Sequence, residues 1–187
     1  MDHTDTALLI SRCREGDASA VEALVQTHKA SVFRLALSML DDPAEADEAA
    51  QDAFVAAIGK LHSYRGESSF TTWLYAITLN VCRGRLRKRR ARERLAQVLH
   101  ALFRAGGESG SHPEHVVIQH ETDRAVWRAI QALDDRQREP VILRYYHDLS
   151  AIEIARVLGV SDRTVRARLH AAHERIRELL TGKADLR

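Results

Sequence analysis

Apolar residues recur every three or four positions along most of the chain, with charged residues between them. This is the period of amphipathic α-helices, and no segment alternates as a half-buried strand does. Asp17 and Asp42 are typical helix N-caps, and Pro43 suits a first helical turn. The pattern predicts helices over about 6–14, 17–40 and 43–61, with Ala46, Ala50, Ala53, Phe54 and Ile58 facing inward on the third.

A loop rich in Gly and Ser (62–70) precedes a fourth predicted helix that carries two apolar stripes. We expect the first stripe to face the core of its own bundle. The second lies on the opposite side and must be buried within the domain or against a partner. The two stripes are Phe70, Leu74, Ile77 and Val81, and Tyr75, Leu79, Cys82 and Leu86.

The composition changes near residue 91, and Gly, Ser and Pro interrupt the helical pattern in "RAGGESGSHPE". We interpret this stretch as an interdomain linker. Helical periodicity returns near 121–133 and 136–147. The chain is therefore predicted to be all-α, with two small helical domains joined by a flexible linker, divided at 1–92, 93–120 and 121–187.

The pattern after residue 149 predicts a helix-turn-helix. Ser150 and Glu153 have the spacing of a capping box, which starts a helix. Gly159 ends that helix, because glycine adopts the left-handed conformation at little cost, and Ser161 caps the next helix. Short helices joined by such a turn are typical of modules that place a second helix in a DNA groove.

The second of these helices has an apolar side and a basic side on a helical wheel. The predicted core side is Val165, Leu169, Ala172 and Ile176. The outward positions Arg163, Arg166, Ala167 and His170 could enter a major groove, where arginine pairs with guanine, and Arg168 and Arg175 on the flank could hold phosphates. The alternative is an ordinary solvated helix whose arginines serve solubility.

The 187 residues carry 28 Lys and Arg against 26 Asp and Glu, so the net charge is only +2. Residues 83–94 nevertheless contain eight positive charges and one negative charge, which makes the distribution more informative than the total. Only two cysteines occur, and neither a signal peptide nor a long apolar span is evident. These features favour a reducing cytoplasm and no membrane insertion.

The basic run continues a face of the fourth helix that begins with Trp73 and Asn80. Arginines beside an aromatic ring and an amide suit single-stranded nucleic acid, in which phosphates meet cations and unstacked bases meet rings. Two simpler interpretations remain open: Trp73 as a core residue and Asn80 as an amide satisfied by helix packing. The third helix is the electrostatic opposite. Asp47, Glu48, Gln51 and Asp52 would repel DNA and favour a basic protein surface.

Three blocks, "DDPAEADEAAQDAF", "YRGESSFTTWLYAITLN" with the basic run after it, and "LSAIEIARVLGVSDRTVRARLHAAHERI", resemble bacterial sigma factors of the extracytoplasmic-function (ECF) group. The resemblance covers nearly the whole chain as a region-2 domain, a linker and a region-4 domain. It implies a non-enzymatic subunit, without cofactor or metal, that directs core RNA polymerase to promoter DNA. An anti-sigma factor is the regulatory partner that the family suggests.

The resemblance also implies roles for individual residues. Asp47, Glu48, Gln51 and Asp52 would dock on core polymerase. The −10 element would be recognised and opened by Tyr64, Arg65, Ser68, Ser69, Trp73, Asn80, Arg83 and Arg87. The −35 duplex would be read by Arg163, Thr164, Arg166, Ala167, Arg168 and His170.

Departures from the family pattern lie in the region-4 block. Leu133-Asp134 stands where a Leu-Pro is common, and Arg163 and Ala167 replace a common Gly and Ser. These changes leave the fold prediction intact and bear on which −35 sequence is preferred.

Two other functions are compatible with parts of the sequence. A two-domain helix-turn-helix regulator would bind DNA without docking on polymerase, but it would not need the acidic third helix. The histidines His112, His115 and His120 have spacing that could suit zinc, although scattered histidines in a polar linker explain them as well.

Overall fold

The computed structural model describes residues 3–103 and 121–182, and within these ranges the chain contains helices, turns and loops but no strand. The predicted all-α fold is confirmed. The elements are α1 (His3–Arg14), α2 (Ala18–Leu40), α3 (Pro43–Gly59), the short 3-10 turn η1 (Leu61–Ser63), α4 (Phe70–Phe103), α5 (Glu121–Gln131), α6 (Asp135–Tyr145), α7 (Ala151–Leu158) and α8 (Asp162–Leu180).

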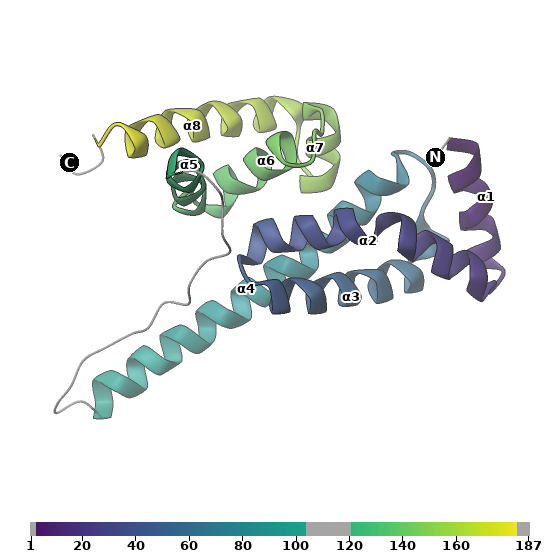
Figure 1. Cartoon of the computed structure of the whole chain (residues 1–187), viewed down its shortest axis with the longest axis horizontal. Coiled ribbons are helices and arrows are strands. Elements are labelled where there is room, and N and C mark those ends of the chain that lie inside the picture. The colour runs from purple at the N-terminus through teal and green to yellow at the C-terminus, as the bar shows by residue number, and fades with distance from the viewer. Residues whose placement is uncertain (1–2, 104–120, 183–187) are drawn as a thin grey trace.

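Helices α2, α3 and the first part of α4 form an N-terminal bundle, with α1 against one end of α2 (Figure 1). The predicted caps are confirmed. The Asp17 carboxylate accepts hydrogen bonds from the backbone N–H groups of Ser19 and Ala20, and that of Asp42 accepts one from Glu45. These bonds satisfy amides that lack partners at a helix start, so α2 and α3 begin where the sequence predicts.

The bundle packs closely because the buried face of α3 is built from alanines. Ala46, Ala49, Ala53 and Ala57 have at most 3% of their surface exposed. Ile58, which we predicted to face inward, is exposed, so that prediction is wrong. It lies one residue, or about 100° around the helix, beyond the buried row that ends at Ala57.

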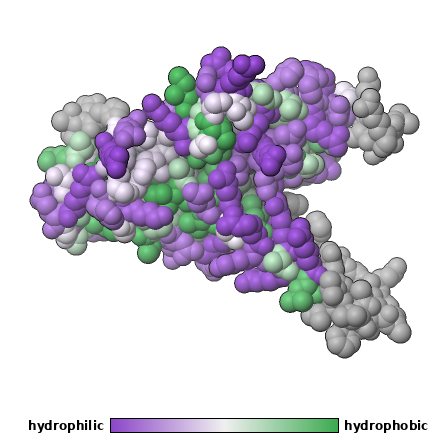
Figure 2. All heavy atoms as spheres, turned by 180° about the vertical axis from the view of Figure 1, so that it is seen from behind, coloured by the Kyte–Doolittle hydropathy of each residue, from purple (hydrophilic) through white to green (hydrophobic). Residues whose placement is uncertain are grey.

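Helix α4 has 34 residues and continues past Arg92, where the sequence suggested a domain boundary, to Phe103. At 1.5 Å per residue it is about 51 Å long, and its second half projects away from the other helices (Figure 1). Hydrophilic side chains cover the first part of this projection in Figure 2. The rest of the predicted linker, with His112, His115 and His120, lies outside the described residues.

Helices α5 to α8 form the C-terminal domain, and the predicted helix-turn-helix is confirmed. Ser150 and Glu153 make both hydrogen bonds of the capping box. Gly159 ends α7 with a φ of 68°, a left-handed conformation, and Ser161 caps α8. Val165 and Ala172 of α8 are buried, whereas Leu169 and Ile176 are half-buried against the same core.

The two domains pack against each other, so the apolar residues that face between them form one continuous cluster. The second stripe of α4 (Tyr75, Leu79, Cys82 and Leu86) is buried in this cluster together with Ile154 and Leu158 of α7. The sequence allows burial of this stripe within its domain or against a partner, and in the structure the chain's own C-terminal domain covers it. Burial also raises the pKa of Cys82 to about 12, so its thiol is not reactive.

No helix in the described part of the chain is long and apolar enough to cross a membrane.

Candidate nucleic-acid and protein interfaces

The loop between η1 and α4 forms a pocket of about 370 Å³. This pocket is lined by four of the residues predicted to contact the −10 element, Tyr64, Arg65, Ser68 and Trp73. Ser63 and Glu67 complete its lining. The loop can turn here because Gly66 takes a positive φ of 74°. Separate positions in the loop and the helix are thus brought around one small cavity.

Hydrogen bonds and ring contacts hold this loop in place. The Tyr64 hydroxyl donates to the backbone oxygen of Ser68 at 2.7 Å, and burial raises the pKa of that hydroxyl. The Trp73 ring lies 5.4 Å from the ring of Tyr64 and 5.5 Å from that of Phe70. Trp73 is half-buried in this aromatic cluster, so it supports the core and also presents part of its ring to the pocket.

Ser69 belongs to the same loop but has a different local role. Its hydroxyl oxygen accepts a hydrogen bond from the backbone N–H of Thr72 at 3.1 Å and lies 2.8 Å from the Thr72 hydroxyl. Ser69 therefore caps α4. It lines an adjoining cavity with Thr6, His28 and Phe70 rather than the Trp73 pocket.

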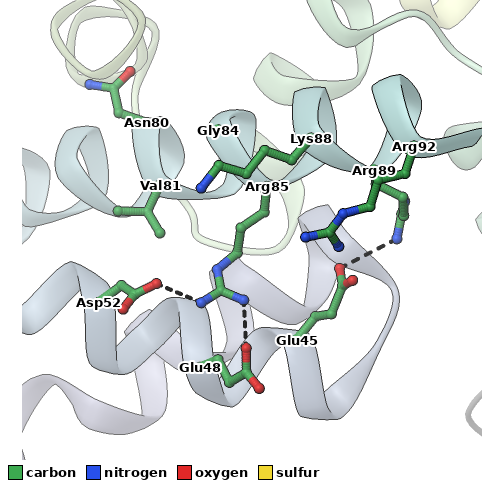
Figure 3. A pocket seen from close by; sticks show the side chains of 10 residues that line it. All are labelled: Glu45, Glu48, Asp52, Asn80, Val81, Gly84, Arg85, Lys88, Arg89 and Arg92. Carbon is green, nitrogen blue, oxygen red and sulfur yellow. Dashed lines mark hydrogen bonds and ion pairs between the residues drawn. The ribbon is translucent and has the colours of Figure 1, made fainter. Parts of the chain in front are cut away.

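A second groove, of about 520 Å³, runs between α3 and α4 (Figure 3). Asn80 lies at its edge with its amide pointing away from α3, whereas Val81 and Arg85 point toward α3. The Asn80 side-chain oxygen accepts a hydrogen bond from Arg83 at 3.3 Å. Asn80 is otherwise exposed, which leaves its amide nitrogen open to a ligand.

The acidic face of α3 is partly occupied by the chain's own arginine. Arg85 reaches across the groove to Glu48 at 2.8 Å and Asp52 at 2.5 Å, and these hydrogen bonds raise the pKa of its guanidinium (Figure 3). Asp47 accepts a hydrogen bond from Gln51. The Glu48 and Asp52 side chains remain 69% and 58% exposed, so a protein partner can still reach them.

The basic run divides into paired and unpaired cations, which its sequence alone does not reveal. Four arginines have carboxylate partners: Arg83 with Glu139, Arg85 with Glu48 and Asp52, Arg89 with Glu45, and Arg90 with Asp135. The remaining four are exposed and have no carboxylate partner among the described residues: Arg87, Lys88, Arg92 and Arg94.

Arg83 and Arg87 line a third pocket, of about 430 Å³, at the contact between the two domains. Arg168, predicted to lie along the flank of the −35 helix, is half-buried in the same pocket. Arg90 and Arg136 complete a group of five arginines there, with Asp135 and Glu139 as the acidic residues.

The outward face of α8 is as predicted from the helical wheel. Arg163, Arg166, Ala167 and His170 are exposed. Arg166 pairs with Asp162 one turn earlier at 3.1 Å, a weak exposed pair that a nucleic acid can displace. Thr164 differs, since its hydroxyl lies 2.8 Å from the capping hydroxyl of Ser161 and is part of the helix start.

Within residues 3–103 and 121–182, no group of three or more His, Cys, Asp or Glu residues is arranged to hold a metal ion. The three linker histidines lie outside these residues, so the zinc alternative stays untested.

Comparisons with known proteins agree with the two-part organisation. The families "Sigma-70 region 2" and "Sigma-70, region 4" match residues 24–92 and 123–176. The chain is 31% identical to the ECF RNA polymerase sigma factor SigW of Bacillus subtilis, over 91% of this chain and 94% of that protein. It is 32% identical to the ECF RNA polymerase sigma-E factor of Escherichia coli K12, over 90% and 91% of the two chains.

Two solved structures have the same overall fold. CnrH, in complex with the cytosolic domain of CnrY, is 27% identical with a TM-score of 0.66, over 95% of this chain and 97% of that chain. The sigma factor RpoE of Bartonella quintana, in complex with the anti-sigma factor NepR, is 24% identical with a TM-score of 0.64, over 88% and 97%.

Proposed function

The chain belongs to the extracytoplasmic-function group of the sigma-70 family, and from that premise we propose how its two domains share promoter recognition. As a member of this family it binds core RNA polymerase and directs transcription initiation at specific promoters. The observation that carries the assignment is the match along nearly the whole chain, with both regions in order.

The N-terminal domain takes the −10 element as an unpaired strand. The pocket at Tyr64, Arg65, Ser68 and Trp73 supports this role, because a half-exposed ring beside polar groups suits an extruded base. Asn80, Arg83 and Arg87 would continue the contact along α4, with Asn80 reading a base edge and the arginines holding phosphates. Ser69 contributes by fixing the loop and the start of α4.

The C-terminal domain reads the −35 element as duplex. The exposed face of α8 supports this role, since Arg163, Arg166 and His170 surround the small Ala167, which allows close approach to bases. Thr164 supports the helix start, and Arg168 would contact the phosphate backbone.

Core polymerase docks on the exposed acidic face of α3. Asp47, Glu48, Gln51 and Asp52 project from adjacent turns of one helix, and a positively charged helix of the polymerase would complement them. Such a partner competes with Arg85 for Glu48 and Asp52, which is feasible because exposed pairs contribute little stability.

The protein acts in the cytoplasm, where core polymerase works, and performs no catalysis of its own. An anti-sigma factor controls it. Support for this partner comes from relatives of the same fold, since RpoE of Bartonella quintana was solved with the anti-sigma factor NepR and CnrH with the cytosolic domain of CnrY.

Run-off transcription tests the proposal. Core polymerase is incubated with genomic DNA fragments, with and without the purified chain, and the start sites are mapped. We expect discrete new start sites that share two upstream motifs. No start site that depends on the chain would contradict the proposal, and DNA binding without any association with core polymerase would favour a regulator instead.

A further inference from the structure

We propose that Asp135 and Glu139 of α6 act as internal phosphate mimics that occupy the nucleic-acid face of α4 and keep the free protein closed. The inference rests on the proposed function, because it takes Arg83 as part of the −10 contact. It gives α6 a role different from that of α8, which reads DNA: α6 competes with the promoter strand for the arginines of α4.

The contacts between α6 and α4 have the geometry of arginine on a phosphate. Arg83 donates two hydrogen bonds to the Glu139 carboxylate, at 2.7 and 2.6 Å. Arg90 donates two to the Asp135 carboxylate, at 2.7 and 2.9 Å. Such two-point contacts are what a guanidinium makes with the oxygens of a phosphate group.

The two pairs follow one another in opposite order along the two helices. Asp135 and Glu139 are one turn apart on α6, and Arg83 and Arg90 are two turns apart on α4, so the long arginine side chains span the difference in rise. Glu139 has only 5% of its side chain exposed and its carboxylate faces Arg83. A carboxylate is buried at low cost only where it is paired, so this contact is specific rather than a chance surface pair.

Apolar burial stabilises the same closed arrangement. The α4 stripe that ends at Leu86 is covered by α7, and Leu86, Leu158 and Val160 line the pocket beside the ion pairs. His147 lies against Tyr75, with ring centres 5.1 Å apart, and the Trp127 indole donates to Asp41 at 3.3 Å. The C-terminal domain therefore also contacts the first part of α4 and the end of α2.

This arrangement cannot be the one that contacts a promoter. Arg83 and Arg168 line a single pocket here, yet they belong to the faces assigned to the −10 and −35 elements. Those elements lie about 25 base pairs apart, or roughly 85 Å of duplex at 3.4 Å per pair. The domains must separate on the promoter, and separation exchanges Glu139 and Asp135 for DNA phosphates.

The test measures binding of a labelled 12-nucleotide single-stranded deoxyoligonucleotide to the full chain across a salt series. We expect the Asp135→Asn/Glu139→Gln variant to bind about tenfold more tightly than the wild type. Two released arginines should also steepen the salt slope by about 0.7 for each phosphate that they contact. The matched control Glu15→Gln/Glu22→Gln removes the same charge from two exposed positions, one in the turn after α1 and one on α2, and should leave both quantities near wild type.

Equal affinity for wild type and the α6 variant, or the same gain in the control, would overturn the proposal. Asp135→Asn alone guards against misfolding, because Asp135 is partly exposed. It should steepen the slope by about 0.7, and an unchanged slope would count against the mimicry. Run-off transcription with the wild type tests the proposed function separately. If the wild type directs initiation but the α6 variants bind the oligonucleotide no more tightly, only the phosphate mimicry is refuted.

Discussion

The arginines of α4 differ in their partners although they are adjacent in sequence. Arg85 is held by two carboxylates of α3, whereas Arg87 is exposed and has no carboxylate partner among the described residues. Substitution should therefore separate residues that stabilise the fold from residues that are available to DNA.

Arg85→Ala should lower the free energy of unfolding by about 1 kcal/mol, because two partly exposed ion pairs are lost and Glu48 and Asp52 are left to repel each other. Arg87→Ala is the matched control and should change it by less than about 0.5 kcal/mol. Urea denaturation followed by circular dichroism measures both. A larger loss for Arg87→Ala would contradict this division.

The two DNA faces predict different binding defects. Arg166→Ala should cost about 1–3 kcal/mol at a preferred −35 site and relax base preference there, because an outward arginine pairs with guanine. Arg87→Ala should weaken all promoters alike and reduce the magnitude of the salt slope by about one. Binding of reconstituted holoenzyme to a small promoter library, across a salt series, compares them. If Arg87→Ala altered base preference while Arg166→Ala altered only the slope, the faces would be assigned in reverse.

At the scale of elements, caps and turns determine where the helices begin and end. Asp17, Asp42, Ser150 and Ser161 all cap helices as predicted, since each side chain bonds to nearby backbone amides regardless of tertiary context. Burial was less predictable. Ile58 is exposed because a one-residue shift in the buried row of α3 moves a side chain by about 100°.

Gly159 offers a direct test of the helix-turn-helix turn. Its φ of 68° is costly for any residue with a side chain, although no atom lies within 4 Å of an added Cβ. Gly159→Ala should therefore destabilise the protein by about 1 kcal/mol through backbone conformation alone. Gly59→Ala, also with open space but in an ordinary helical conformation, should cause no loss or stabilise by about 0.5 kcal/mol. Equal losses in urea denaturation would show that the left-handed turn is not the cause.

At the scale of the whole molecule, the sequence predicts both domains but not their contact. Local patterns reveal capping and periodicity, whereas the pairing of Arg83 with Glu139 joins residues 56 positions apart. The sequence likewise predicts one face of α4 for four of the −10 residues, and the structure distributes them over three cavities. Trp73 lines the loop pocket, Asn80 the α3–α4 groove, and Arg83 and Arg87 the interdomain pocket. The sequence offered one signal of the contact, the second apolar stripe of α4, without indicating what covers it.

Acid should weaken the contact between the domains. Burial and the nearby Arg34 lower the pKa of His147 to about 4, while Asp148 acts in the opposite direction and Tyr75 bonds to the ring. An exposed histidine has a pKa near 6.5. As the pH falls from 6.5 toward 4, His147 therefore takes up a proton more readily in the separated state than in the closed state, and the closed arrangement loses stability. Small-angle scattering should show expansion between pH 7 and 5 that is reduced in His147→Gln. The same expansion in both proteins would assign it to other groups.

We propose that the two promoter-binding faces of this one chain are held together in the free protein and separated on the promoter. The most direct measurement is the distance between spin labels at Val55→Cys on α3 and Leu180→Cys on α8, both exposed positions, while the native Cys13 and Cys82 are buried. We predict one narrow distance distribution for the free chain and a clearly different distance in a transcriptionally active promoter complex. The same distance in both states would contradict this separation.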